Sequence, residues 1–462
     1  MPTAHPSVAE REARGRAART AVPRSQQSAL ELSPGRDPVA VLAAQDATRL
    51  PDLVPIRYER MLASPLAFFR GAAAIMARDL AASPSSGLDA QLCGDAHLMN
   101  FGGFASPERN LVFDVNDFDE TLQGPFEWDV KRLAASLDVA ARTRGFRDAD
   151  RTAAVLRGVR AYREAIRTFA AMGDLDVWYA RLDAQAVLDE LRAAHDAKVA
   201  KKLDAQIERA RTNDGRRALA TLTHVVDGKP RFVSEPPLVV PLAADDAAAT
   251  IVEEAFRSYR ASLAHDRRVL LDRFSYVDVA RKVVGVGSVG TRCWIMLLLG
   301  RDDGDPLILQ MKEAETSVLG KSRIANAGER VVQGQRLMQA SSDIFLGWVR
   351  VAHDVDGARR DFYVRQLRDW KLSVDVEAII PRGLSYYATA CGWTLARAHA
   401  RSGDRVAIAA YLGASDRFDR AIADFAAAYA DVNERDHAAL AQAAAASSTP
   451  PAASCQLPQK RS

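Results

Sequence analysis

The sequence has few cysteines, no long apolar run and little net charge, and each of these absences excludes a class of protein. The four cysteines, Cys93, Cys293, Cys391 and Cys455, lie far apart and form no C-x-x-C pair. We therefore expect neither a disulfide framework nor a structural zinc site. We also expect a cytoplasmic protein, because the cytoplasm keeps thiols reduced. The longest apolar run, residues 293–299, is far shorter than the roughly 20 residues of a membrane-spanning helix, so no membrane partner is expected.

The net charge and the length of the chain exclude further classes of protein. A formal net charge of +3 lacks the strong basic excess of a nucleic-acid-binding protein, so we expect no nucleic-acid partner. The start of the chain carries arginines but no apolar core segment, which argues against a secretory signal. The 462 residues, of which 48% are hydrophobic and 26% charged, have the composition of a globular protein with one large or two ordinary domains.

The pattern along the chain predicts an α+β protein in five segments. Residues 1–45, rich in Ala, Arg, Ser and Pro, show no periodicity, and we expect them to form a disordered basic tail. Residues 46–273 read mainly as helices with polar loops among them. Residues 274–370 alternate or run apolar like antiparallel strands, and residues 371–440 contain two long helical patterns. Residues 441–462 form an Ala/Ser/Pro tail that we also expect to be disordered.

Oxygen-bearing side chains gather in one of these polar loops. They are, with His97 beside them, Asp95, Asn100, Asp114, Asp117, Asp119 and Glu120. Mg²⁺ prefers carboxylate and amide oxygens, although Asp- and Asn-rich segments are also typical of ordinary turns. Asp95 and Asn100 have the D-x-x-x-x-N spacing of a protein-kinase catalytic loop, and Asp117 follows an apolar strand and precedes a Phe, as the metal-binding Asp of kinases does. Asp114 is a rival to Asp117 as the metal ligand.

A glycine-rich segment lies much later in the chain. Gly285, Gly287 and Gly290, with Ser288 among them, match G-x-G-x-x-G. A Rossmann fold requires a helix directly after the glycines, but here a strand pattern follows, then a polar turn and a second apolar strand that reaches Lys312. Two strands flanking the glycines and a third with a lysine are typical of a kinase phosphate-binding loop, so we expect these residues to bind ATP.

Further positions complete the predicted nucleotide site. Lys312 would contact the α- and β-phosphates, although a surface lysine at a strand end is the commoner case. The next predicted helix offers Glu329 as the ion-pair partner of this lysine. A later strand continues through Gln366 and Leu367 toward Arg368, where backbone groups would bind adenine unless it is an ordinary core strand.

Three blocks of sequence carry a resemblance to known families. They are Gly94-Asp-Ala-His-Leu-Met-Asn-Phe-Gly102, Val112-Phe-Asp-Val-Asn-Asp-Phe-Asp-Glu120 and Gly124-Pro-Phe-Glu-Trp-Asp-Val-Lys-Arg-Leu-Ala-Ala-Ser136. These blocks closely resemble an uncharacterised bacterial family, domain of unknown function twenty-two fifty-two, and the resemblance extends from about Tyr58 to about Leu440. They are also similar to the aminoglycoside phosphotransferase and choline kinase branch of the kinase-like superfamily.

The kinase resemblance implies roles for individual residues. Asp95 would be the catalytic base, and Asn100 and Asp117 would hold Mg²⁺. Asp129 would brace the catalytic loop, although an acid in the first turn of a helix is also favoured by the helix dipole. His97 would orient the loop rather than bind metal. The resemblance also implies a two-lobed fold, with a small antiparallel-sheet lobe that binds the nucleotide and a larger helical lobe that carries the catalytic and metal loops.

The order of the motifs departs from that of these kinases. There the glycine-rich loop and the lysine come first, whereas here the catalytic blocks occupy residues 94–136 and the nucleotide motifs occupy residues 285–368. The helix predicted at residues 384–401 resembles the one that leads into the catalytic loop, yet no such loop follows it. A circular permutation, with the old termini joined through residues 150–273, accounts for this order, and permutation is tolerated where the new ends lie on the surface.

The sequence therefore predicts a circularly permuted kinase-like protein that transfers a phosphoryl group from Mg–ATP to a hydroxyl of an unidentified small molecule or protein. An AMP transferase on the same fold and a non-catalytic nucleotide-binding regulator are the alternatives. A metal-dependent hydrolase built only on residues 94–120 is a further alternative, but it leaves the segment from Gly285 to Lys312 without a role. The sequence identifies neither the acceptor nor the oligomeric state.

Overall fold

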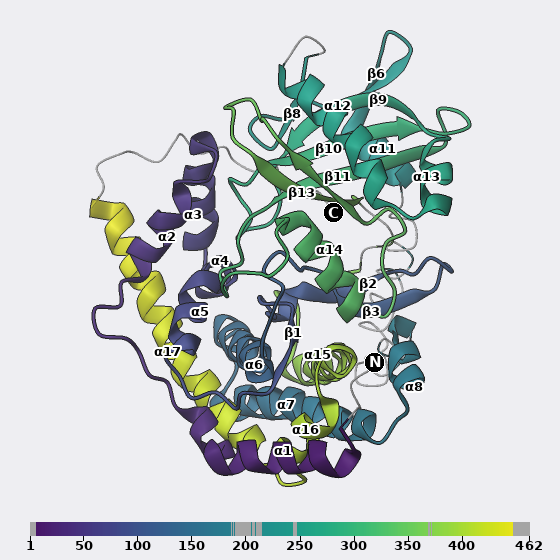
Figure 1. Cartoon of the computed structure of the whole chain (residues 1–462). Helices are drawn as coiled ribbons and strands as arrows, with labels where there is room; N and C mark the ends of the chain where they lie inside the picture. Colours follow the sequence, from purple (N-terminus) through teal and green to yellow (C-terminus); the bar gives the residue numbers. More distant parts are fainter. Residues whose placement is uncertain are drawn as a thin grey trace.

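The structure, a computed structural model, describes residues 6–185, 187, 189, 205, 208, 215–243, 247–367, 370 and 372–446. Helices and antiparallel strands are both present and largely segregated, which confirms the expected α+β class. A six-stranded sheet with its surrounding helices forms one part, and a helical core with two short groups of strands forms the other (Figure 1). Among the described helices, none combines the length and the apolar character that crossing a membrane would need.

The large sheet has the strand order β12-β13-β11-β10-β9-β8, and all neighbouring strands are antiparallel. The strands are β8 (Val239–Pro241), β9 (Ser275–Lys282), β10 (Cys293–Leu299), β11 (Pro306–Ala314), β12 (Gly347–Val351) and β13 (Arg360–Gln366). The other elements of this part are α11 (Gly215–Leu222), the hairpin of β6 (Thr223–Val226) and β7 (Lys229–Phe232), α12 (Ala247–Tyr259), α13 (His265–Leu271) and α14 (Ala327–Met338). The hairpin turns at Asp227 and Gly228, whose φ angles of 50° and 74° suit a two-residue turn.

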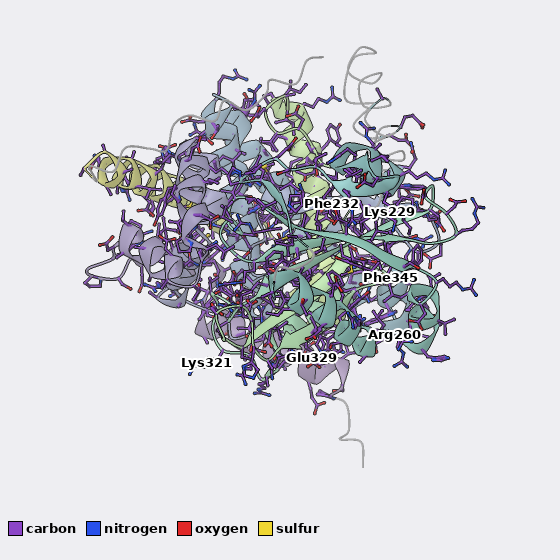
Figure 2. The ribbon with its side chains drawn as sticks, turned by 90° about the horizontal axis from the view of Figure 1, so that it is seen from above. Lys229, Phe232, Arg260, Lys321, Glu329 and Phe345 are labelled. Carbon is purple, nitrogen blue, oxygen red and sulfur yellow. The ribbon has the colours of Figure 1, made fainter. Side chains whose placement is uncertain are left out.

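Alternation along the strands gives the large sheet two apolar faces. On β10, Met296 belongs to a cluster that also contains Phe345 and side chains of α12. Its neighbour Ile295 belongs to a second cluster, which contains Phe232 and side chains of α11. Figure 2 labels Phe345 and Phe232, one from each cluster. Helices on both faces therefore bury the sheet.

The other part is built on helices whose buried side chains form one large hydrophobic core and two smaller clusters. Its helices are α1 (Val8–Ala21), α2 (Pro38–Asp46), α3 (Val54–Leu62), α4 (Pro65–Gly71), α5 (Ala73–Ala81), α6 (Phe126–Thr143), α7 (Asp148–Ala170), α8 (Asp174–Tyr179), α15 (Pro381–Ser402), α16 (Arg405–Leu412) and α17 (Arg417–Ala446). Helices α7 and α15 approach closely because a glycine of each lies at the crossing. A Cβ on Gly392 would lie 2.1 Å from the carbonyl oxygen of Gly158.

Two short groups of strands position the polar loops. β1 (Asp89–Leu92) pairs with β4 (Leu122–Pro125), and β2 (Phe101–Ala105) pairs with β3 (Leu111–Val115), which also pairs with β5 (Leu182–Asp183). The loop of residues 93–100 therefore connects β1 to β2, and the loop of residues 116–121 connects β3 to β4. Each loop is anchored at both ends by a paired strand.

The disorder predicted for residues 1–45 is wrong for the described residues, which begin at residue 6. Helix α1 starts with a capping box, in which Ser7 and Glu10 satisfy each other's backbone N–H groups. It packs so closely on α16 that a Cβ on Gly15 would lie 2.1 Å from the carbonyl oxygen of Ala407. The arginines contribute to this contact, since Arg19 donates to a carbonyl at the end of α16 at 2.9 Å.

Two other predicted boundaries shift. Helix α17 runs to Ala446, so residues 441–446 are helical rather than disordered, and residues 447–462 lie outside the described residues. The sheet-containing part begins near Gly215 rather than at residue 274, because α11, β8 and α12 pack on or pair with the large sheet. The segment of residues 46–273 is therefore divided between the two parts.

Candidate active site

Asp129 holds the loop of residues 93–100 in place. Its carboxylate, in the first turn of α6, accepts the N–H of Cys93 at 2.8 Å and that of Gly94 at 3.0 Å. His399 Nε2 lies 3.3 Å from the same carboxylate, and its Nδ1 lies 2.8 Å from the hydroxyl of Tyr162. The buried His399, on α15, thus belongs to the support of this loop.

Asp95 lies near the start of this loop, and its carboxylate is fixed from one side. The guanidinium of Arg132, from α6, donates to Asp95 Oδ1 at 2.8 Å. His97 Nε2 lies 3.7 Å from Asp95 Oδ2, and burial lowers the pKa of His97 to about 4, so the imidazole is neutral at neutral pH. Asn100 Nδ2 donates to the carbonyl of Asp95 at 2.8 Å, which leaves Asn100 Oδ1 as an acceptor.

Asp119 connects the loop of residues 116–121 to the large sheet. Its carboxylate forms an ion pair with Lys312 of β11 and accepts the hydroxyl of Tyr363 of β13 at 2.7 Å. Lys312 and Tyr363 are opposite each other in the β11–β13 register, so both side chains leave the same face of the sheet. Burial opposes the charge of Lys312, but the neighbouring Asp119 raises the pKa of its amine above the ordinary value.

The predicted ion pair between Lys312 and Glu329 is not formed. Glu329 lies in the first turn of α14, where its side chain accepts from Gln333 at 2.7 Å (Glu329 is labelled in Figure 2). The inward-facing residue of this turn is Arg330, which donates to the carbonyl of Asp119 at 2.8 Å. The sequence placed Glu329 on the right helix, but a one-residue difference is about 100° around a helix and turns its side chain away.

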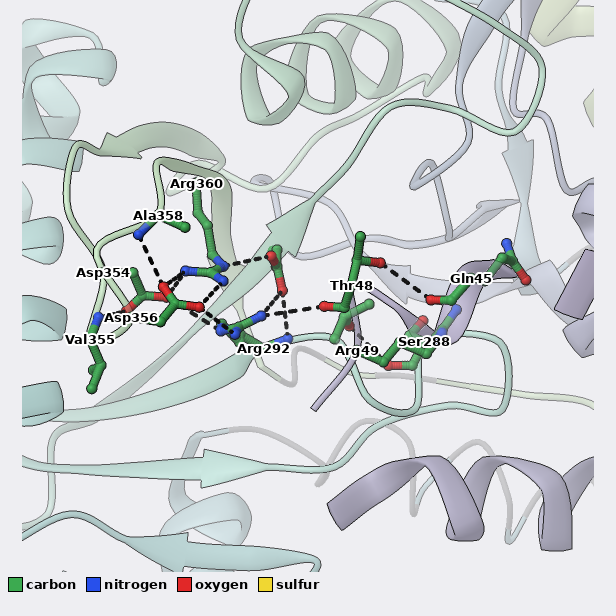
Figure 3. A network of polar contacts seen from close by, with 12 residues as sticks. Gln45, Thr48, Arg49, Ser288, Arg292, Asp354, Val355, Asp356, Ala358 and Arg360 are labelled. Atoms are coloured by element: carbon green, nitrogen blue, oxygen red, sulfur yellow. Dashed lines mark hydrogen bonds and ion pairs between the residues drawn. The ribbon is translucent and has the colours of Figure 1, made fainter. Parts of the chain in front are cut away.

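The acid next to Lys312 has its own partners. Glu313 pairs with Arg292 at 3.4 Å and with Arg360 at 3.2 Å. Both arginines also contact Asp354 and Asp356, which forms the charged network drawn in Figure 3. Glu313 is therefore used in holding β10, β11 and β13 together at this end of the sheet.

The glycine-rich loop connects β9 to β10 and is held by an N-terminal segment, residues 49–71. Arg60 donates to the carbonyl of Gly285 at 2.5 Å, Leu50 donates to that of Gly290 at 2.8 Å, and Arg49 donates to that of Val289. Gly285 and Gly290 have φ angles of 69° and 95°, a region that favours glycine. Figure 3 shows Arg49 beside Ser288 of this loop. The glycine-rich loop is thus fixed by residues 49–71, which precede the loop of residues 93–100 in the sequence.

One pocket brings the two sequence-distant segments together. Of the predicted residues, its lining includes Asp95, His97, Asn100, Asp117, Gly285, Gly287 and Ser288. Lys312 does not line the pocket, but it forms an ion pair with Asp119, and Asp119 lines the pocket. Gly290 lies at the base of the loop, against Arg49.

Asp114 is separate from this pocket. It is 1% exposed and forms an ion pair with Arg397 of α15, which is equally buried. Its second oxygen accepts the N–H of Ala340 at 2.8 Å. Strand β3 turns Asp114 toward the helical core, whereas Asp117 lies beyond the strand end and lines the pocket. The geometry is therefore against Asp114 as a metal ligand and leaves Asp117.

The predicted adenine-binding residues are also outside the pocket lining. The backbone N–H of Gln366 donates to Asp343 at 2.5 Å, and its side chain donates to the same carboxylate at 2.8 Å. The N–H of Leu367 donates to the carbonyl of Ile308 at 2.9 Å. Both backbone donors are occupied within the protein, so an adenine contact there is not supported, and Arg368 lies outside the described residues.

The donor set near Asp117 fits a metal that arrives with a nucleotide. Asp117 Oδ1 accepts the N–H of Asp119 at 3.2 Å, and Asn100 Oδ1 is available beside it in the pocket lining. Within the described ranges, no three His, Cys, Asp or Glu side chains are arranged to hold a metal by themselves. Mg²⁺ commonly takes only one or two protein carboxylates and completes its shell with water and substrate phosphates.

Several residues of this site were not predicted. Arg132 fixes the carboxylate of Asp95, and Tyr363 fixes that of Asp119. Arg49 and Arg70 line the pocket from the N-terminal segment. Arg132 lies within the quoted block of residues 124–136 but was given no role, whereas Arg49, Arg70 and Tyr363 lie outside the three quoted blocks. Asp119 belongs to the predicted acidic cluster, two residues after Asp117, but its pairing with Lys312 was not predicted.

Comparison with known proteins gives one match. A family model described as "Uncharacterized protein conserved in bacteria (DUF2252)" matches residues 49–443, a range that contains the glycine-rich loop and both polar loops. No curated protein and no solved structure matches the chain.

Proposed function

The chain belongs to the DUF2252 family, and we propose that it is a Mg–ATP-dependent phosphotransferase, with a circularly permuted kinase-like arrangement, that acts on a hydroxyl group. The observation that carries this proposal is the meeting of two distant segments in one pocket. Asp95 and Asp117 line it from one side and Gly287 from the other, and Lys312 is paired with Asp119 between them. A hydrolase that used only the acids of residues 94–120 would need neither the loop nor the lysine.

Asp95 would act as the base of the reaction. Its free oxygen accepts the proton of the acceptor hydroxyl while that oxygen attacks the γ-phosphorus, the bond from the γ-phosphorus to the β–γ bridging oxygen breaks, and ADP leaves. Arg132, which donates to Oδ1 at 2.8 Å, orients the carboxylate during this step. His97 is neutral at neutral pH, so it adds no second positive charge beside Asp95.

The phosphates would be held from the sheet side. Backbone N–H groups of the glycine-rich loop cover them, and the ammonium of Lys312 has three donors, enough for Asp119 and a phosphate oxygen together. Asn100 and Asp117 would hold Mg²⁺, which neutralises charge on the transferred phosphoryl group. Catalysis of this kind depends on positioning and charge neutralisation more than on covalent chemistry.

The end of α15 supports the circular permutation. In the unpermuted order this helix would lead directly into the catalytic loop. Here its last residue, Ser402, accepts the N–H of Gln91 in β1 through its hydroxyl at 3.1 Å. A Cβ on Gly403 would lie 2.9 Å from the carbonyl oxygen of Asp89. The helix thus ends beside the strand that enters the catalytic loop, so a short connection would restore the order of other kinases.

Calorimetric titration with Mg–ATP tests the site. We expect the wild type to bind, Lys312→Ala to weaken binding by about tenfold or more, and Asp117→Ala to remove the dependence on Mg²⁺. Lys321→Ala, at an exposed lysine of a neighbouring pocket, is the matched control and should bind like the wild type. Absence of binding in the wild type would overturn the nucleotide function.

Product analysis then separates the enzyme classes. Incubation with Mg–ATP and a panel of alcohols, sugars and hydroxyl-bearing peptides should yield ADP and a phosphorylated acceptor. Pyrophosphate as the product would identify AMP transfer instead. A protein that binds the nucleotide but phosphorylates no acceptor, and whose nucleotide affinity is unchanged by Asp95→Asn, would be better described as a nucleotide-binding regulator.

A further inference from the structure

Arg70 is a partly buried cation of the pocket that the mechanism above does not use. It lies near the end of α4, and its side chain lines the pocket together with Asp95, Asp117 and Gly287. Its Nε is buried and has no hydrogen-bond partner among the described residues. Burial lowers the pKa of its guanidinium, while Asp95 and Asp117 attract it through space. Arginine stays protonated at neutral pH, so this charge persists in a partly dry site.

The neighbouring cations differ from Arg70 in having an acceptor. Lys312 is paired with Asp119, Arg132 with Asp95, and Arg49 donates to the carbonyl of Val289. A buried charge is stable only when it is paired or hydrogen-bonded. No described residue accepts a hydrogen bond from the buried Nε of Arg70, so the guanidinium is left with donor capacity for an anion from outside the protein.

The backbone around Arg70 fixes where that anion would lie. A Cβ on Gly287 would be 3.1 Å from the carbonyl oxygen of Arg70 and 3.8 Å from Cα of Gly71, so the middle of the glycine-rich loop rests on the end of α4. The side chain of Arg70 therefore lines the pocket beside this loop, and Asp95 lines the same pocket. In a nucleotide whose phosphates lie under the loop, the phosphate that is nearest to Asp95 is the terminal one.

We propose that Arg70 binds the terminal phosphate of the nucleotide and gives the site its preference for a nucleoside triphosphate over a diphosphate. This inference rests on the proposed function. The guanidinium presents a planar fork of donors that matches two phosphate oxygens. Arg70 comes from a helix that precedes the catalytic loop, so the N-terminal segment would contribute directly to substrate binding as well as holding the loop.

The test compares Mg–ATP and Mg–ADP by calorimetry on the wild type and on Arg70→Met. We expect Arg70→Met to weaken ATP binding by about tenfold to a hundredfold and to leave ADP binding within about twofold of the wild type. Arg70→Lys keeps the charge but loses the fork, and it should fall between the two. Arg60→Met is the matched control, because Arg60 contacts the loop carbonyl of Gly285 without lining the pocket. It should change both affinities by the same factor.

Each outcome decides the inference. Equal losses for ATP and ADP on Arg70→Met, or no loss for ATP, would overturn it while leaving the proposed function intact. A wild type that binds neither nucleotide would overturn both. Should Arg70→Met fail to fold, as judged by circular dichroism, the ATP-to-ADP affinity ratio of Arg70→Lys decides, and an unchanged ratio overturns the inference.

Discussion

Asp114→Asn should lower the free energy of unfolding and leave Mg–ATP binding unchanged. Asp117→Asn should leave the free energy of unfolding unchanged and impair Mg–ATP binding. Asp114 and its partner Arg397 are each 1% exposed. The substitution keeps the size of the side chain but removes its charge, so Arg397 is left buried without a counter-charge. Asp117 accepts only a local backbone N–H and lines the pocket, so its loss affects the ligand rather than the core.

The structure sets the size of the effect. Removing one partner of a buried ion pair costs about 3–5 kcal/mol. The unfolding entropy of about 2 cal/mol/K per residue amounts to roughly 1 kcal/mol/K for a chain of this length, so for cooperative unfolding the Tm should fall by about 3–5 °C. Arg397→Met in the Asp114→Asn background removes the unpaired charge and should recover part of the loss.

Thermal and urea unfolding, with calorimetric titration of the same samples, measure both effects. The reasoning is refuted if Asp114→Asn unfolds like the wild type, or if it abolishes the Mg²⁺ dependence of ATP binding while Asp117→Asn preserves it. Strictly additive losses for Asp114→Asn and Arg397→Met would show that the two side chains do not act as a pair.

Three further substitutions test packing and pH dependence. Gly392→Ala should cost about 1–3 kcal/mol in urea unfolding, because its Cβ would lie 2.1 Å from the Gly158 carbonyl where α7 and α15 cross; an unchanged midpoint would mean that the helices separate freely. Burial raises the pKa of Glu120 from 4.5 to about 7. Between pH 4.5 and about pH 7, the folded state therefore holds more protons than the unfolded state. Stability should therefore fall as the pH rises through this range, by at most about 1.4 kcal/mol per pH unit. Glu120→Gln should remove this slope from unfolding midpoints measured between these two pH values, and equal slopes in both proteins would contradict the assignment. Gly15→Val should lower the Tm more than Ala17→Val, on the exposed side of the same helix, and equal Tm values would show that α1 does not depend on its contact with α16.

Local sequence patterns were sufficient for the elements and for much of the site. The expected α+β class is confirmed because strand and helix periodicities are separate along the chain. The motif spacings placed Asp95 and Asn100 in one loop, and the D-x-D that contains Asp117 at a strand end. Periodicity failed for the N-terminal region, where α1 is polar on most sides and is held by a capping box and by one glycine contact, which leave little apolar signal.

Long-range pairing was decided only by the tertiary structure. Whether Asp114 or Asp117 can bind a metal depends on which side of β3 faces α15. There Arg397, 283 residues later in the chain, pairs with Asp114. The partner of Lys312 is Asp119 rather than Glu329, because the rotation of α14 turns Arg330 inward instead.

The sequence by itself determined which residues have the chemistry for a phosphate and metal site, since residue type and spacing are local properties. Only the tertiary structure brought the loop at Gly287 onto Arg70 and into the same pocket as Asp95, because that contact depends on how the N-terminal helices pack against a sheet whose strands come much later in the chain. Such packing is set by the sum of many weak apolar contacts, and no single motif records it.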